Sequence, residues 1–172
     1  MSSPTSWLVQ HAGLLPREGR ALDVACGRGR HALWLAEHGL TTLAVDRDSE
    51  AIRELNEAAR ERRLPLRADV RDLEGGETSF HGSTFDVIVV VHYLHRPLFP
   101  ALIEALAPGG VLVYETFTRA QAARGKPTNP DFLLEPGELL DLVQPLEILA
   151  SREGDFDGRM IASVIARRGS AS

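Results

Sequence analysis

The stretch Asp23-Val-Ala-Cys-Gly27-Arg-Gly29-Arg30 decides the fold of this chain, because it joins a short apolar run to a helical pattern through small residues at alternate positions. The run, residues 20–24, predicts a strand, and residues 31–38 predict a helix that ends at Gly39. Glycine lets the chain turn sharply and lets a ligand approach bare backbone amides. These amides and the helix N-terminus favour a negatively charged group. The stretch therefore predicts a binding loop at the carboxyl end of a strand.

The alternation of strand and helix continues after this loop. Residues 41–45 predict a second strand, and Asp48 is placed to cap the helix that follows it. A third strand is expected over residues 64–68, where Pro65 weakens the pattern. The helix between them has one apolar face at helical spacing, formed by Ala51, Ile52, Leu55, Ala58 and Ala59. This β-α-β-α-β series predicts a parallel sheet with right-handed crossovers and helices on both faces.

The second half of the chain extends the same sheet. Residues 85–91 are apolar apart from Asp86, as expected for a central strand of a parallel sheet. Asp157-Gly158 signals an antiparallel hairpin near the C-terminus. The remaining expected elements are helices over residues 5–14, 97–107 (stopped by Pro108-Gly109-Gly110) and 136–143, and strands over 111–117, 146–152 and 160–166. The predicted fold is a single α/β Rossmann-like three-layer sandwich, with a mostly parallel seven-stranded sheet and an antiparallel C-terminal hairpin.

Length and composition limit the class of protein. The chain has 172 residues, which suits a single domain over residues 1–172 without repeat or linker, as a monomer or a homodimer. A net charge of −5 disfavours a nucleic-acid partner. We expect no membrane association and a cytoplasmic location, because no apolar run approaches the ~20 residues of a membrane span and the start lacks the features of a signal peptide. The single cysteine excludes an internal disulfide.

The glycine loop alone leaves two cofactors open. Gly27-Arg-Gly29-Arg-His-Ala32 also fits the G-x-G-x-x-A pattern of dinucleotide-binding proteins, so an NAD(P)-dependent oxidoreductase is an alternative. Asp46 ends the second strand, where its carboxylate can accept hydrogen bonds from both hydroxyls of a ribose. Asp69 follows in the third strand, where it could meet an adenine amino group. A dinucleotide would need a second nucleotide-binding half and a substrate region, for which the chain is too short.

Five short motifs stand in order at normal spacing. Ala-Leu-Asp23-Val-Ala-Cys-Gly27-Arg-Gly29 comes first, and the others are Leu-Ala-Val-Asp46, Ala-Asp69-Val70, Phe85-Asp86-Val-Ile-Val and Leu106-Ala-Pro108-Gly109-Gly110. Over roughly residues 18 to 117 the sequence resembles the class I S-adenosylmethionine-dependent methyltransferases. Arg30-His31 after the loop is similar to the branch that contains the tellurite-resistance-type methyltransferases of small molecules.

The resemblance implies S-adenosylmethionine as the cofactor and assigns residues to it. Gly27 and Gly29 would pass beside the methionine moiety, and Asp23 or a nearby backbone carbonyl would receive its ammonium group. Asp46 would hold the ribose. The other residues expected around the cofactor are Ala25, Arg30, Arg47, Asp69, Val70 and Val91, with Asp69 and Val70 bordering the adenine.

Two departures from the family pattern bear on this assignment. Ala25 stands where the family often has glycine, and its methyl group is tolerable if the residue keeps a negative φ. Residues 74–84 are polar and irregular, so the helix that often joins the third and fourth strands is not expected here, and the adenine wall would be partly loop.

Residues for chemistry are expected after the fourth and fifth strands. Methyl transfer mainly needs alignment of donor and acceptor and, if the acceptor carries a proton, a base. His92 is the candidate general base, with a hydrogen-bonded histidine that shapes the pocket as the alternative. The family's amino-group methyltransferases carry an Asn-Pro-Pro-Tyr-like segment here, and Val91-His92-Tyr93-Leu94 replaces it. We therefore expect an oxygen, sulfur or softer chalcogen acceptor.

Substrate specificity is expected to come from the long segment 118–135, a candidate lid. Arg119, Arg124 and Lys126 make it locally basic, which suits an acidic or oxyanion substrate. The candidate substrate residues are Tyr93, Arg96, Glu115, Arg119 and Phe132.

Three further expectations concern what the chain does not do. His11, His31, His38 and His81 show no metal-ligand spacing with acidic partners, so no metal is expected. Cys26 is expected to be apolar filler beneath the loop rather than a nucleophile. A non-catalytic cofactor-binding subunit with the same fold is the remaining alternative to an enzyme.

Overall fold

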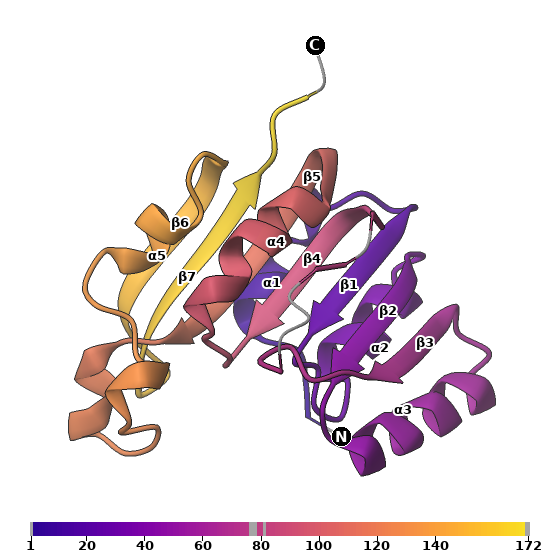
Figure 1. Cartoon of the computed structure of the whole chain (residues 1–172), viewed down its shortest axis with the longest axis horizontal. Coiled ribbons are helices and arrows are strands. Elements are labelled where there is room, and N and C mark those ends of the chain that lie inside the picture. The colour runs from indigo at the N-terminus through magenta and orange to yellow at the C-terminus, as the bar shows by residue number, and fades with distance from the viewer. Residues whose placement is uncertain (1, 76–78, 81, 171–172) are drawn as a thin grey trace.

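The chain folds around one twisted sheet, whose strands lie in the order β3-β2-β1-β4-β5-β7-β6 (Figure 1). The computed structural model describes residues 2–75, 79–80 and 82–170. Within this part of the chain the strands are β1 (Arg20–Val24), β2 (Thr41–Asp46), β3 (Leu66–Val70), β4 (Phe85–Val91), β5 (Leu106–Phe117), β6 (Glu147–Phe156) and β7 (Arg159–Arg167). The helices are α1 (Ser6–Gln10), α2 (Arg30–Glu37), α3 (Ser49–Glu61), α4 (Phe99–Ala105) and α5 (Glu138–Leu142), with short 3₁₀ turns at Ala12–Leu14, Arg96–Leu98, Arg119–Ala123 and Pro130–Phe132.

Strand direction follows the expected pattern. The strands from β3 to β5 are mutually parallel, whereas β7 pairs antiparallel with both β5 and β6. The strand order reverses between β1 and β4, because the chain builds outward through β2 and β3 and then returns to the middle. In an open α/β sheet such a reversal leaves a crevice beyond the carboxyl ends of the two strands. The predicted α/β fold with a mostly parallel seven-stranded sheet is confirmed.

Strand β4 shows why the central run is apolar on both sides. Val87 and Val89 belong to a buried cluster that includes side chains of α1 and α2 on one face. Ile88 and Val90 belong to another, which includes side chains of α4 and α5 on the opposite face. Since helices cover both faces of the strand, neither set of alternate side chains reaches solvent, and Val87 to Val91 are all apolar.

Helix α3 forms as its sequence predicts. Oδ1 of Asp48 accepts hydrogen bonds from the backbone N–H groups of Glu50 and Ala51, both at 3.1 Å, and so caps the helix. The expected apolar face is the one that packs on the sheet, and its buried members are Ala51, Ile52, Leu55 and Ala59. The helix is thereby fixed against β2 and β3.

The third strand begins two residues later than expected, at Leu66. Pro65 lies before the strand, where its carbonyl still accepts from the N–H of Thr42. The Asn56 side chain then holds Ala68 from both sides, donating to its carbonyl and accepting from its N–H at 2.9 Å each. As a result β3 reaches Val70, opposite Asp46.

Other boundaries were also wrong, and α4 ends at Ala105 rather than at the expected residue 107. Pro108-Gly109-Gly110 does not form a turn before the fifth strand but an irregularity inside β5, because Leu106 already pairs with Phe85. A Cβ at Gly110 would lie 2.9 Å from the carbonyl oxygen of Phe85, so only glycine fits this close approach. The expected N-terminal helix is divided into α1 and a 3₁₀ turn, and segment 118–135 contains two 3₁₀ turns. The hairpin at Asp157-Gly158 is as predicted, with φ of 56° and 80°.

The two glycines of the binding loop differ in what surrounds them, and this difference is testable. Both have positive φ, but a Cβ on Gly29 would lie 2.4 Å from Leu55 in the core, whereas a Cβ on Gly27 would meet nothing within 4 Å. We therefore expect Gly29→Ala to lower the free energy of unfolding by about 1–3 kcal/mol more than Gly27→Ala, measured by urea denaturation. Equal losses for the two variants would contradict this packing role of Gly29.

Candidate active site

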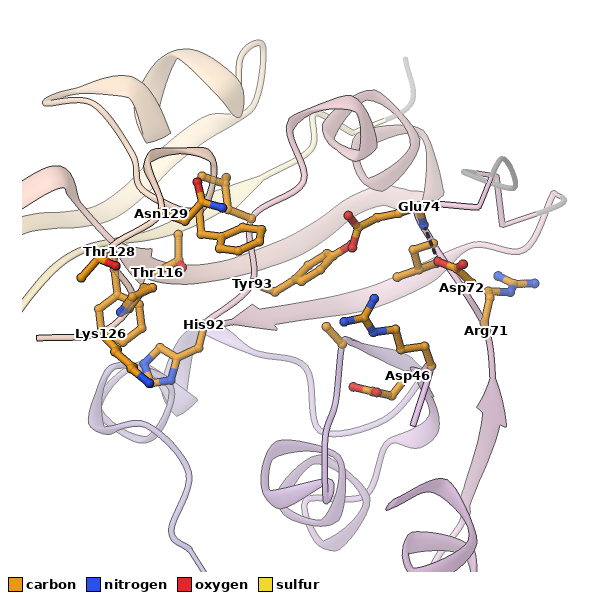
Figure 2. A pocket seen from close by; sticks show the side chains of 17 residues that line it. Asp46, Arg71, Asp72, Glu74, His92, Tyr93, Thr116, Lys126, Thr128 and Asn129 are labelled. Atoms are coloured by element: carbon orange, nitrogen blue, oxygen red, sulfur yellow. Dashed lines mark hydrogen bonds between the residues drawn. The ribbon is translucent and has the colours of Figure 1, made fainter. Parts of the chain in front are cut away.

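A cavity of about 710 Å³ lies beyond the carboxyl ends of the parallel strands (Figure 2). This volume is within the usual range for small-molecule sites. Figure 2 shows two groups of side chains in it, with Tyr93 between them. We name one the acidic end, lined by Asp46, Arg47, Arg71, Asp72 and Glu74. We name the other the loop end, lined by His92, Thr116, Phe117, Lys126, Pro127, Thr128, Asn129 and Phe132.

Asp46 at the acidic end is held in one orientation by backbone amides. Its Oδ2 accepts from the N–H of Gly27, and its Oδ1 accepts from the N–H of Asp48, both at 2.9 Å. Each carboxylate oxygen retains acceptor capacity beyond one bond. The carboxylate is therefore fixed at the edge of the cavity and can still accept from a ligand's hydroxyl groups.

The loop between β1 and α2 leaves its backbone open at Gly27, where a side chain would meet no other group. Cys26 lies beneath the loop at 7% exposure, and burial raises the pKa of its thiol far above the usual range. A neutral buried thiol is a poor nucleophile, which supports the expected role of Cys26 as filler.

Two residues that directly follow neighbouring strands adopt a left-handed backbone conformation. Ala25, after β1, has φ 56°, and His92, after β4, has φ 58°. Ala25 therefore does not meet the condition of a negative φ. Its backbone adopts the left-handed conformation that glycine usually adopts. A non-glycine residue in this region costs about 1–2 kcal/mol. Strain of this kind concentrates at functional sites, and both residues line the cavity.

Asp23 does not line the cavity. Its side chain lies beneath the loop at 1% exposure, and its Oδ2 has no hydrogen-bond partner within residues 2–75, 79–80 and 82–170. Burial raises the pKa of this carboxyl to about 8, although the N–H of Ala32 and the charge of Arg30 act in the opposite direction. The geometry thus leaves the contact with the ligand to backbone groups of the loop.

The residues expected around an adenine are placed unevenly. Asp69 pairs with Arg67 at 3.2 Å, and Val70 is 56% exposed; neither lines the cavity. Asp72, which the sequence did not single out, does line it and accepts from the N–H of Glu74 at 3.0 Å. Arg47 also lines the cavity, whereas Val91 is buried in the sheet.

His92 lies at the boundary between this cavity and a second, smaller one. Its ring stacks on Phe117 with the centroids 4.6 Å apart. Its backbone N–H donates to the backbone carbonyl of Glu115 at 2.8 Å. Burial lowers the pKa of His92, and the charges of Arg30 and Arg159 act in the same direction against the smaller opposing effect of Glu115. The imidazole is therefore neutral at pH 7 and able to accept a proton.

The second cavity, of about 230 Å³, is rich in charged side chains. Arg30, Glu115, Arg152, Asp157 and Arg159 line it, together with residues 4–6 of the N-terminal segment. The Arg152 guanidinium lies over two rings, 4.9 Å from the centroid of Trp7 and 4.0 Å from that of Phe156. Three arginines against two carboxylates make the cavity favourable for an anionic group.

The expected substrate residues divide between the two cavities and the supporting structure. Tyr93 and Phe132 line the large cavity, and Glu115 lines the second one. The hydroxyl of Tyr93 donates to Oε2 of Glu74 at 3.2 Å. Arg96 and Arg119 line neither cavity. Arg96 donates to Glu138 and to the carbonyls of Asp131 and Leu133, whereas Arg119 pairs with Glu135 at the surface.

Sequence reasoning missed Asp72 and the arginines of the C-terminal hairpin. Arg152 and Arg159 lie on β6 and β7, far along the chain from the glycine loop. They reach the site because β7 inserts beside β5. Alternation of polar residues along the two strands was the available signal, but it does not reveal which face meets the ligand.

No three metal-ligating side chains gather within the described residues in a way that could hold a metal ion. His81 lies outside those residues, and the absence of a metal stays a prediction. In the same part of the chain, no helix combines the length and the apolar character needed to cross a membrane.

This strand order, with antiparallel β7 between β5 and β6, a glycine loop after β1 and a fixed carboxylate at the end of β2, is that of the class I methyltransferase fold, whose cofactor is S-adenosylmethionine. Residues 21–110 match the model of the methyltransferase-domain family, and the chain belongs to this family. A putative methyltransferase of Bacillus subtilis, YqeM, is 28% identical over 130 residues, which cover 69% of this chain and 49% of that protein.

Two solved structures show the same fold. TehB from Haemophilus influenzae superposes with a TM-score of 0.84 at 20% identity, covering 98% of this chain and 63% of that one. An S-adenosylmethionine-dependent methyltransferase from Mesorhizobium loti superposes with a TM-score of 0.75 at 19% identity, covering 95% of this chain and 98% of that one. The chain spans between 32% and 49% of the length of the curated relatives that it matches.

The different surroundings of the two arginines lead to a prediction about segment 118–135. Arg96→Ala removes bonds to Glu138 and to two loop carbonyls, and is expected to lower the free energy of unfolding by about 1–3 kcal/mol. Arg119→Ala, the matched control, breaks one exposed ion pair and should change it by no more than about 0.5 kcal/mol. Urea denaturation measures both variants, and a smaller loss for Arg96→Ala than for its control would refute the anchoring role.

Proposed function

We propose that this chain transfers a methyl group from S-adenosylmethionine to a small-molecule acceptor at an oxygen, sulfur or softer chalcogen atom. The observation that carries the proposal is that the large cavity has two ends. The fixed carboxylate of Asp46, at the end of β2, lies at one end, and His92, Phe117 and Lys126 lie at the other. Such a cavity has room for a donor and an acceptor to meet.

The residues present fit the cofactor. Asp46 would accept from the ribose hydroxyls, since amides already orient its carboxylate. The open backbone at Gly27 would lie along the methionine moiety, and Asp72 with Arg47 would border the adenine. Arg30, which follows the loop and lines the second cavity, is placed to attract the methionine carboxylate.

An anionic or oxyanion acceptor suits the charges around the loop end. Lys126 lines the large cavity there, and Arg152 and Arg159 line the second cavity on the other side of His92. Arg119 and Arg124, which also make segment 118–135 basic, pair instead with Glu135 and Asp155. The attraction for an anion therefore comes mainly from the second cavity.

The chemistry asked of the protein is modest. When bound, S-adenosylmethionine supplies a methyl group already activated by its sulfonium. The chain's residues would align the acceptor, exclude water and accept a proton where the acceptor has one to lose. The acceptor's lone pair would take the methyl group, leaving the sulfur as a neutral thioether, and any proton that the acceptor loses would pass to the neutral ring of His92. A soft chalcogen anion would need no base.

Two alternatives remain useful in designing tests. An oxidoreductase would bind NAD(H) rather than S-adenosylhomocysteine, and a non-catalytic subunit would bind the cofactor without methylating any member of a broad acceptor panel. Family membership favours a methyltransferase over the first of these. The cytoplasmic location, the absence of a nucleic-acid partner and the monomeric or homodimeric state belong to the proposal as inferences from composition.

Binding of S-adenosylhomocysteine tests the cofactor assignment. Asp46→Ala is expected to weaken binding by about 1–3 kcal/mol, or roughly 5- to 150-fold, measured by isothermal titration calorimetry. Asp72→Ala should also weaken it, whereas Asp69→Ala, the control that removes a carboxylate paired outside the cavity, should leave it within about twofold. Unchanged affinity in Asp46→Ala would overturn the ribose assignment.

The pH dependence of turnover tests His92. With a phenol as the acceptor, release of S-adenosylhomocysteine should be constant between about pH 6.5, the ordinary imidazole value, and about pH 8, well below the ordinary phenol value of about 10. It should fall as the pH drops through the lowered pKa of His92, because the protonated ring cannot act as a base. His92→Ala should lower turnover on protonated acceptors by about 10²- to 10⁴-fold and remove this fall, with cofactor binding nearly intact. Full turnover in the variant would refute the role of His92 as base.

A further inference from the structure

The carboxylate of Glu115 has three hydrogen-bond donors from three separate parts of the chain. Its Oε1 accepts from the Thr5 hydroxyl at 2.6 Å, and its Oε2 accepts from the Ser163 hydroxyl at 2.6 Å and from the Arg152 guanidinium at 3.4 Å. The residue is 3% exposed. A buried carboxylate that accepts from three donors in this way holds these groups in place.

On one side, Glu115 orients Arg152. The Nε of Arg152 donates to Ser163 Oγ at 3.4 Å, and Ser163 in turn donates to Glu115, so the serine joins the two charged groups. The guanidinium also lies over the rings of Trp7 and Phe156. These contacts hold Arg152 where it lines the second cavity.

On the other side, Glu115 holds residues 3–6, which lead into α1 and which we name the N-terminal strap. Thr5 occupies the N-cap position of α1, but its side chain makes no capping bond and donates to Glu115 instead. The Thr5 N–H donates to Nε2 of His31 at 3.1 Å, and Arg30 donates to the carbonyl of Ser3 at 3.0 Å. Burial lowers the pKa of His31 to about 3, so its ring is neutral and can accept.

Polar bonds are the main attachment of the strap. The side chains of residues 3–6 are exposed or only partly buried, whereas Trp7 is 4% exposed and Leu8 is fully buried. The strap can therefore leave the wall of the second cavity without uncovering the core, if the bonds from Thr5 are broken. The hydroxyl of Thr5 on Glu115 is the shortest of these bonds.

We propose that Glu115 is a positioning residue for the acceptor, because its carboxylate both orients Arg152 in the second cavity and latches the N-terminal strap over that cavity. The role rests on the proposed function, in which Arg152 faces the anionic part of the acceptor. Substrate selection at this site would then depend on Glu115 through the groups that it holds, Arg152 and the strap.

The test uses Glu115→Gln, which keeps the size of the side chain but removes its charge and turns one of its two acceptor oxygens into an N–H₂ donor. The first readout is hydrogen–deuterium exchange of residues 2–8. The second is the Nε resonance of Arg152 in ¹⁵N-labelled protein, assigned with Arg152→Lys. The matched control is Glu135→Gln, which removes the partner of Arg119 from an exposed glutamate–arginine pair elsewhere.

In Glu115→Gln we expect exchange of the strap to rise about three- to tenfold and the Arg152 resonance to move, with neither change in the control. Thr5→Val, which does not touch the core, should raise strap exchange alone, and Thr5→Ser should restore protection. These results would support the positioning role.

Unchanged strap exchange and an unchanged Arg152 resonance in Glu115→Gln would overturn the positioning role; if that variant does not fold, unchanged strap exchange in Thr5→Val overturns it. Affinity for S-adenosylhomocysteine should stay within about twofold in all these variants, because none of the altered side chains is among those proposed to hold the cofactor. Failure of the unmodified chain to bind S-adenosylhomocysteine would instead refute the proposed function, a result independent of both readouts.

Discussion

The parallel pairing of β1 with β4 is the constraint on which the rest of the site depends. It sets the carboxyl ends of the two strands side by side at the point where strand order reverses. The backbone must therefore turn directly after each strand. Ala25 and His92 make these turns with left-handed backbones. The first turn opens the backbone at Gly27 beside Asp46, and the second places an imidazole between the two cavities. The strain at both turns is offset by the buried apolar contacts of the strands that carry them.

The sequence predicted most of the fold because its signals were local. Apolar runs of strand length, the capping Asp48 and the Asp157-Gly158 turn each depend on neighbouring residues, and each corresponds to an element of the structure. The errors arose where tertiary contacts decide. The third strand begins after Pro65, and the Asn56 side chain binds the backbone of Ala68 within it. The Pro108-Gly109-Gly110 segment lies within β5, because Leu106 already pairs with β4. Neither contact leaves a pattern in the sequence.

The site could be predicted in part, and the division has a physical reason. Residues next to the glycine loop and at the end of β2 were expected from their position, and Ala25, Asp46 and Arg47 line the cavity. Residues whose role depends on side-chain direction could not be assigned, and Arg96 turns out to anchor a loop while Arg152 faces a cavity. The cluster around Glu115 joins residues 110 positions apart in the chain, and only the folded sheet brings them together.

These features describe a methyltransferase domain in which the two ends of one cavity would receive donor and acceptor, and in which buried polar groups far from the glycine loop shape the acceptor side. The most direct test of this account is a crystal structure of the chain with S-adenosylhomocysteine bound. The account predicts the ribose on the Asp46 carboxylate, the methionine along the Gly27 backbone and the sulfur directed toward His92. A ligand whose sulfur lies away from His92, or whose ribose does not contact Asp46, would contradict it.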